Sequence, residues 1–242
     1  MSDIDEPIRI EVTLPARFDT VWQAFRVPEA IRRWHGWEYD GLDAEIHCIY
    51  EEETTASQPD RALEIGGHLF ALDDRGDEVI VRVTRSLAAA ESWTDYYDEI
   101  EQGWLGFLQQ LRFALARHPG EDRRTVRLEG QALASNPLPV IGTLGLTAAA
   151  SVEVGKRYEA DAAWGDDLVG EVWFRAPDQL GLTVDGWGDG LLVVTSSRAS
   201  PGAAALTATT YGFDDDALTG LHDRMAATWF TAYGPLEQPE LA

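Results

Sequence analysis

Two stretches of the chain, 61–115 and 178–233, repeat one order of elements: strand patterns, a turn of Gly and Asp, and a long amphipathic helix pattern. The stretches share order and spacing rather than residue identity, which is typical of a diverged internal repeat. Strands and an amphipathic helix bury their apolar faces against each other. The repeat predicts an α+β protein built from two related halves.

The helix pattern at 94–117 is the strongest in the chain. Ser92 or Thr94 can cap its start, and Pro119-Gly120 ends it. Its apolar positions recur every three or four residues, at Tyr97, Ile100, Trp104, Phe107, Leu108, Leu111 and Leu115. A second long helix is predicted at 215–233, where Asp214 to Asp216 suit the positive end of a helix dipole. Its buried face would carry Leu218, Leu221, Met225, Thr228, Trp229 and Ala232.

Alternating apolar residues and turn signals predict the strands. In the first half, strands are expected at 8–14, 45–50, 61–65, 68–72 and 78–84, with helices at 16–26 and from Pro28. In the second half, strands are expected at 125–130, 151–154, 168–174, 180–185, 191–196 and 204–211, with a short helix around 138–144. Asp189-Gly190 is a tight-hairpin signal. The polar stretch 120–124 separates the halves, which predicts domains at 1–119 and 120–242.

The charge balance restricts the classes of partner that the protein is expected to bind. Asp and Glu number 42 against 19 Lys and Arg, a formal net charge of -23. So acidic a surface repels phosphate backbones and anionic lipid headgroups, so we expect neither nucleic acid nor a membrane as partner. Cys48 is the sole cysteine, which fits a reducing compartment. Without a signal-peptide pattern or an apolar run long enough to cross a bilayer, the chain is expected to be cytoplasmic.

Two motifs in the first half resemble a known superfamily. The segment 12–34 contains Leu14-Pro15-Ala16, Val21-Trp22-Gln23-Ala24, Pro28-Glu29 and Trp34, and a later Gly103-Trp104 opens the body of the long helix. The pattern is similar to START-like (SRPBCC) helix-grip proteins, and within them to the AHSA-type branch, the bacterial homologues of the heat-shock ATPase activator. The resemblance covers 7–118; the second half resembles the fold only through its strand and helix order, as a divergent copy.

This resemblance implies a fold and a range of functions. The fold would be a curved antiparallel sheet wrapped around a long C-terminal helix, with an apolar cavity between them. The superfamily includes lipid carriers, hormone receptors, aromatic polyketide cyclases and interaction modules, so the fold alone does not select a function.

Aromatic residues are the richest candidate lining for such a cavity, because Trp and Tyr combine a large apolar area with one polar group. His47 and His68 would add polar groups, as would His35, since histidine moves protons near neutral pH. The same residues could instead simply fill a core. The expected ligand-binding residues are Trp34, Trp37, His47, Tyr50, His68, Tyr97, Trp104, Trp173, Trp187 and Trp229.

Other chemistry is poorly supported by the pattern. The five histidines lack a metal-ligand spacing, so no metal is expected, and no cofactor either. Gly186 to Gly190 is followed by a strand pattern instead of a helix, which argues against a phosphate loop. The acidic runs 51–53 and 214–216 read as a solvated loop and a helix start. Cys48 is interpreted as a small buried apolar residue rather than a nucleophile.

Three functions therefore compete. The leading hypothesis is binding of a hydrophobic or aromatic small molecule, which favours a protein that is not an enzyme. The second is a polyketide cyclase or aromatase-like enzyme in which a cavity His or Tyr acts as acid or base. The third is a co-chaperone-like module with a protein partner, and a homodimer is left open as well.

Overall fold

The computed structural model describes residues 10–85, 94–136, 138–197 and 200–236; for Arg85, 94–99 and Glu101 it describes the backbone only. The chain divides into two compact units, Met1–Glu121 and Asp122–Ala242. Each unit is a mixed α+β fold with one antiparallel sheet.

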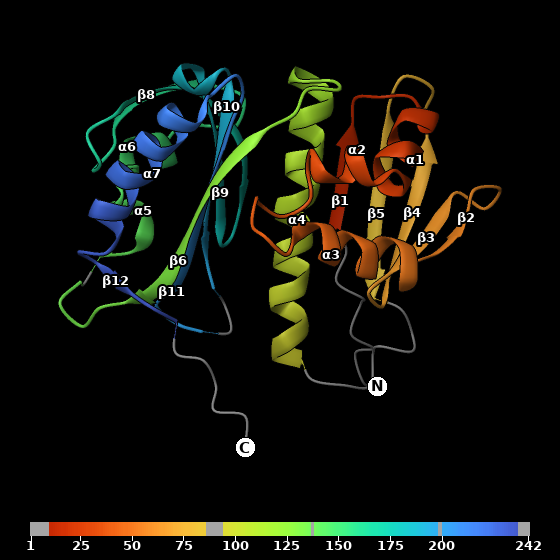
Figure 1. The fold of residues 1–242 in the computed structure, drawn as a ribbon, viewed down its shortest axis with the longest axis horizontal. Coiled ribbons are helices and arrows are strands. Elements are labelled where there is room, and N and C mark those ends of the chain that lie inside the picture. The colour runs from red at the N-terminus through yellow and green to blue at the C-terminus, as the bar shows by residue number, and fades with distance from the viewer. Residues whose placement is uncertain (1–9, 86–93, 137, 198–199, 237–242) are drawn as a thin grey trace. The chain divides into compact units, whose positions relative to one another are not determined.

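The first unit has one five-stranded sheet in the order β1-β5-β4-β3-β2, and every neighbouring pair is antiparallel (Figure 1). Its elements are β1 (Ile10–Leu14), α1 (Phe18–Arg26), α2 (Pro28–Arg32), α3 (Leu42–Ile46), the π-helical segment η1 (His47–Glu52), β2 (Thr55–Ser57), β3 (Ala62–Ile65), β4 (His68–Asp74), β5 (Val79–Arg85) and α4 (Thr94–Arg117).

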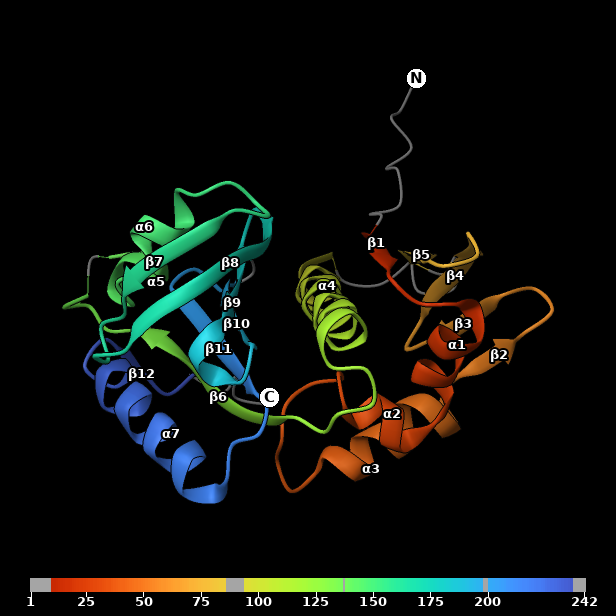
Figure 2. The same cartoon turned by 90° about the horizontal axis from the view of Figure 1, so that it is seen from above.

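The second unit has a seven-stranded sheet in the order β12-β6-β11-β10-β9-β8-β7, again antiparallel throughout (Figure 2). Its elements are β6 (Arg124–Ala132), α5 (Val140–Thr143), α6 (Thr147–Ala150), β7 (Arg157–Asp161), β8 (Asp167–Ala176), β9 (Gln179–Val184), the 3-10 turn η2 (Asp185–Trp187), β10 (Gly190–Ser196), β11 (Ala203–Thr210), α7 (Asp215–Trp229) and β12 (Tyr233–Gly234). The helices α5, α6 and α7 share one side of this sheet (Figure 1).

The two units share a common topological pattern, although the second has two more strands. In each, the first strand pairs with the strand before the long helix, so β1 lies beside β5 and β6 beside β11. Short helices separate the first strand from the second, and a long helix follows the last strand of the run. This arrangement is a tandem helix-grip fold, which the repeated element order and the family resemblance together implied.

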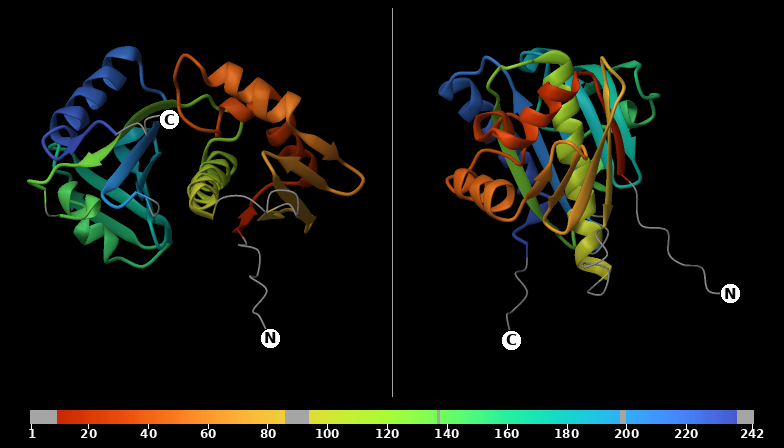
Figure 3. Two further views of the ribbon diagram at one scale, coloured as in Figure 1. Left: turned by 90° about the horizontal axis from the view of Figure 1, so that it is seen from below. Right: turned by 90° about the vertical axis from the view of Figure 1, so that its right-hand side faces the viewer.

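The first core lies between its sheet and α4. Strand β1 alternates buried and exposed residues, so Ile10, Val12 and Leu14 face inward. Helix α4 packs along β1 and adds Leu108 and Leu111 to the same core (Figure 3). Each fully buried aliphatic side chain contributes roughly 1.5–3 kcal/mol relative to exposure, so this interface holds α4 in place.

The second core is built the same way. Asp214 caps α7, because its carboxylate accepts a hydrogen bond from the Ala217 amide at 2.9 Å. From that start, Leu221, Met225 and Trp229 come to face the sheet and are buried in the core of the second unit. The predicted buried face is confirmed at these positions, whereas Thr228 is only half-buried.

The strand predicted at 45–50 is wrong, because 42–52 is helical. Ile46 and Tyr50 are buried and satisfy both a strand and a helix pattern, since they lie four residues apart. Leu42 and Cys48 decide between the two. Leu42 is buried one helical turn before Ile46, while Cys48, which a strand would bury, is half-exposed. The interpretation of Cys48 as a core residue is therefore also wrong.

A second strand prediction, 151–154, is wrong as well. These residues form the turn after α6, and the strand follows at β7. Only Tyr158 and Ala160 of β7 are buried, so its inward face carries little of the apolar signal by which strands are recognised.

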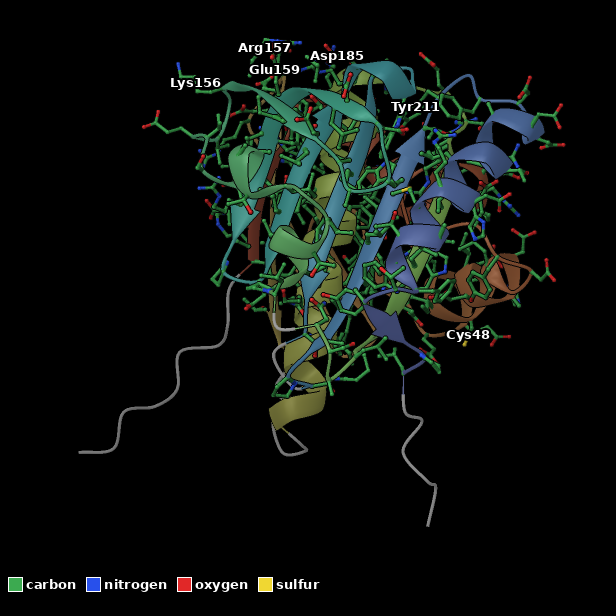
Figure 4. The ribbon with its side chains drawn as sticks, turned by 90° about the vertical axis from the view of Figure 1, so that its left-hand side faces the viewer. Cys48, Lys156, Arg157, Glu159, Asp185 and Tyr211 are labelled. Carbon is green, nitrogen blue, oxygen red and sulfur yellow. The ribbon has the colours of Figure 1, made fainter. Side chains whose placement is uncertain are left out.

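The hairpin expected at Asp189-Gly190 exists, but its turn differs. Val184 pairs with Gly190, and the chain between them makes the 3-10 turn η2 and then a left-handed Gly188 with φ +69°. A β-carbon on Gly188 would lie 2.1 Å from the Tyr211 carbonyl oxygen. Glycine is therefore required here for both reasons, conformation and space. Tyr211 lies at the same end of the sheet as Asp185 (Figure 4).

Candidate functional site

A group of ring side chains lies between the sheet and the middle of α4 in the first unit. Phe70 on β4 meets Trp104 on α4 with ring centroids 4.8 Å apart, and His35 meets Phe107 at 4.8 Å. Edge-to-face pairs of this kind add roughly 0.5–1.5 kcal/mol each beyond the area they bury. We call this set the aromatic cluster; its members are Phe25, Trp34, His35, Tyr50, Phe70, Trp104 and Phe107.

The elements around the sheet bring these rings together. Trp34 and His35 follow α2, Tyr50 comes from η1, and Trp104 and Phe107 lie nearly one turn apart on α4. The Trp34 indole donates a 2.9 Å hydrogen bond to the Ala24 carbonyl, which satisfies its polar group in the core.

A hydrogen-bonded chain runs from this cluster toward the surface. The Tyr50 hydroxyl lies 2.9 Å from His35 Nδ1, and His35 Nε2 lies 3.2 Å from Glu45 Oε1. A carboxylate accepts only, so in neutral His35 the proton belongs on Nε2, and Nδ1 accepts from Tyr50. Tyr39 donates to the other Glu45 oxygen at 2.6 Å. His35 and Tyr50 are buried, whereas the Glu45 side chain is 33% exposed.

The chain shifts the pKa of its members. The hydrogen bond from His35 lowers the pKa of Glu45 despite the opposing effect of partial burial. Burial, followed by the nearby Glu45 charge, raises the pKa of Tyr50 well above its usual value. The hydrogen bond to Glu45 raises the pKa of Tyr39 to about 12. Both tyrosines are therefore neutral donors at physiological pH.

A pocket of about 240 Å³ lies between α1, α2 and the C-terminal end of α4. We call it the first-unit pocket. Its apolar wall includes Trp34, Leu111, Ala114 and Leu115, and its polar groups include Gln23, Arg33 and His118. His118 is buried, and its Nδ1 lies 3.4 Å from Glu121 Oε2.

Several of the predicted site residues of the first half come together. Tyr50, His68 and Trp104 are buried in one core, and the His68 and Trp104 rings lie 6.4 Å apart. His68 Nδ1 donates to the Gly66 carbonyl at 3.0 Å. Trp34 belongs to the aromatic cluster and also lines the first-unit pocket.

Other predicted residues lie elsewhere. His47 is exposed on η1, where Glu51 Oε2 lies 2.6 Å from its Nδ1, so it does not face the cluster. Trp37 is half-buried beside Tyr39, with ring centroids 6.3 Å apart. The Tyr97 side chain is outside the described residues.

The predicted residues of the second half do not form one lining. Trp187 and Trp229 are buried in the core, where Trp229 stacks on Tyr233 at 4.2 Å. Trp173 sits at a β-bulge between Val172 and Phe174, outside that core cluster. A β-bulge redirects the side chains around it, which the strand pattern could not indicate.

The second unit nevertheless has a pocket, of about 220 Å³, between α5, α6 and strands β9 and β10. We call it the second-unit pocket. Short aliphatic residues such as Leu180 and Val194 form its floor, and Arg175 and Asp178 lie at its rim. None of these residues stands in a recognisable motif, so sequence reasoning missed them, as it missed Glu45 and His118.

Within the described ranges, no group of three or more His, Cys, Asp or Glu side chains is placed to hold a metal ion. Among the same residues, no helix combines the length and apolar character that a membrane crossing needs.

The strand order defines the chain as a tandem helix-grip fold, and a pocket is found in each half. No family model and no curated protein matches it. Among solved structures it is similar to DynU16, a protein of the dynemicin biosynthetic locus, with 16% identity, a TM-score of 0.33 and coverage of 93% of this chain and 95% of that one. It is also similar to StfQ, a di-domain ARO/CYC of the steffimycin pathway, with 11% identity, a TM-score of 0.32 and coverage of 92% and 91%. At these TM-scores neither likeness decides the fold or the chemistry, and the fold rests on the strand order alone.

Proposed function

We propose that this protein binds a small hydrophobic or aromatic molecule in the first-unit pocket. The observation that carries the proposal is the composition of that pocket: an indole and aliphatic side chains together with a few polar groups. Ligand sites usually have this character, because the apolar wall supplies affinity and sparse polar groups fix the orientation of the ligand.

The volume restricts the ligand. Pockets for drug-sized molecules measure about 300–1,000 Å³, and this one measures about 240 Å³. It therefore suits a ligand smaller than a drug-sized molecule, such as a single aromatic ring or a short branched chain. Trp34 is itself almost fully buried and its polar group is already bonded to Ala24, so it lines the pocket as a fixed apolar residue.

A pocket-filling variant tests the proposal. Ala114 lines the pocket from α4, so Ala114→Leu should fill it while keeping a good helix former. Ala116 lies on the same helix, is exposed, and provides the matched control Ala116→Leu. Ligand-observed NMR with a panel of single-ring aromatics should give binding to the native protein and to the control, and none to Ala114→Leu. Equal binding by all three proteins would refute the proposed site.

A second candidate is acid–base catalysis in the same pocket. The observation in its favour is that His118, a buried pocket residue, lies beside the Glu121 carboxylate. A carboxylate at Nδ1 fixes the tautomer and the orientation of the imidazole ring. By contrast, neither His35 nor Tyr50 belongs to the pocket lining.

His118→Gln separates the two candidates. A binding protein should retain its ligand in this variant, and chromatography should return the ligand unchanged from the native protein. An enzyme should convert the ligand, and His118→Gln should abolish conversion while leaving affinity within a few fold.

A further inference from the structure

We propose that the second unit holds an independent ligand site, the second-unit pocket, which takes a small apolar molecule with a carboxylate or similar anionic end. It differs from the first-unit pocket in its walls: sheet and short helices here, helices alone there. This proposal can therefore be tested separately from the proposed function.

The floor of the pocket is apolar and fixed. Leu180 on β9 and Val194 on β10 come from adjacent paired strands, and both are almost fully buried. Val140 and Ala150 face them from α5 and α6. Their backbone and rotamers are set by the hydrophobic core of the unit, to which Leu180, Val194 and Val140 belong. A ligand would therefore meet a preformed surface and lose little affinity to reordering.

Two hydrogen bonds fix the rim. The Ser196 amide donates to the Asp178 carbonyl at 2.9 Å, which ties the β8–β9 turn to the end of β10. Arg175 donates through its Nη2 to the Val152 carbonyl at 2.7 Å, which ties β8 to the turn after α6. The segments that border the opening are thus held together before any ligand arrives.

Arg175 sets the charge of the ligand. A guanidinium has five N–H donors in a fixed fork that matches a carboxylate. The Val152 bond takes one of them and restrains the guanidinium, so part of the entropy cost of ordering it is already met. The chain carries a net charge of -23, so an anion is repelled from most of its surface. An anionic ligand would need a local cation, and Arg175 is the cationic residue in this lining. Asp178 lies at the same rim and would favour an amine, so the experiment must separate the two charges.

Three probes of nearly the same shape make that separation: benzoate, benzamide and benzamidine. Methyl NMR of the full-length chain would be recorded with each. We expect benzoate to shift the Leu180 and Val194 methyl signals with the highest affinity of the three. Arg175→Gln should weaken benzoate at least tenfold and change benzamide binding less than twofold.

Two further variants locate the site. Ala150→Leu fills the pocket and should abolish the benzoate shifts, whereas Ala148→Leu, an exposed position on the same helix, should preserve them. Ala114→Leu blocks only the first-unit pocket and should leave these shifts intact. Failure of the first site with intact Leu180 and Val194 shifts would refute the proposed function alone.

Two outcomes would overturn this inference. If no probe shifts Leu180 and Val194 in the folded protein, the pocket is not a ligand site. If benzamidine binds most tightly and loses affinity in Asp178→Asn, the site is cationic and the role of Arg175 is refuted.

Discussion

The hydroxyl of Tyr50 and Nδ1 of His35 lie 2.9 Å apart inside the first core, where both side chains are almost fully shielded from water. This hydrogen bond joins η1 to the segment after α2, and Glu45 extends it to the surface. Together with the buried Leu42 and Ile46, it anchors the helical segment 42–52 on the core.

Tyr50→Phe should destabilise the protein by about 1–3 kcal/mol, because the ring stays while a buried histidine nitrogen loses its partner. Urea unfolding followed by circular dichroism would measure the change. Tyr39→Phe is the matched control, since its hydroxyl bonds to Glu45 at the other end of the same hydrogen-bonded chain but its side chain is exposed; its effect should be clearly smaller. Equal losses in both variants would contradict the anchoring role of Tyr50.

Glu45 should make stability depend on pH in the acid range. Its pKa is lowered in the folded protein from an ordinary value of 4.5, so its contribution is fully present above pH 4.5 and is lost as the pH falls through the folded-state pKa. The difference in unfolding free energy between the native protein and Glu45→Gln should be constant near neutral pH and shrink below 4.5. A difference that grows on acidification would reverse the sign and disprove this assignment.

Gly188→Ala should lower stability by more than about 1 kcal/mol, because alanine disfavours the left-handed region and its methyl group would strike the Tyr211 carbonyl. Gly186→Ala, two residues earlier in the same turn, has no atom within 4 Å of the added carbon and no positive φ. Thermal unfolding of both variants gives the comparison. The turn geometry would be refuted if both variants melted together.

Cys48 should react slowly with alkylating reagents even though it is accessible (Figure 4). Its thiol lies 3.5 Å from a Glu53 oxygen, and this hydrogen bond is the main cause that raises its pKa, so less thiolate is present at a given pH. Glu53→Gln should speed modification at pH 8, and mass spectrometry follows this single thiol directly. Glu51→Gln, which removes a neighbouring charge bonded to His47 instead, should leave the rate nearly unchanged.

The helices and strands that the sequence predicted well are those whose buried residues fit only one period. Helix α4 and strand β1 each bury residues at a single spacing, so their faces were predictable. At 42–52 the buried positions Ile46 and Tyr50 fit both the period of a strand and the period of a helix, and the prediction of a strand was wrong. Strand β7 carries too few apolar residues to stand out from its neighbours.

The pockets were less predictable than the elements. Trp34, Tyr50 and Trp104 were correctly expected to lie near one another, because their elements converge on one side of a sheet. Whether large rings surround a space or fill it depends on packing at the ångström scale, and their spacing in sequence does not encode that. Pocket residues such as Ala114 and Ala150 matter through their small size, which leaves no periodic signal.

The pairing of the first strand with the strand that precedes the long helix has a consequence for synthesis on the ribosome in each unit. Ile10 cannot meet Val83, nor Thr125 meet Thr209, until all the intervening strands have been translated. Strands β1 and β6 therefore remain unpaired in the nascent chain until β5 and β11 have been made. Pairing between strands so distant in sequence makes the folding of each unit slow. The completion of β5 and β11 thus sets the earliest moment at which each half can become a closed, protease-resistant body.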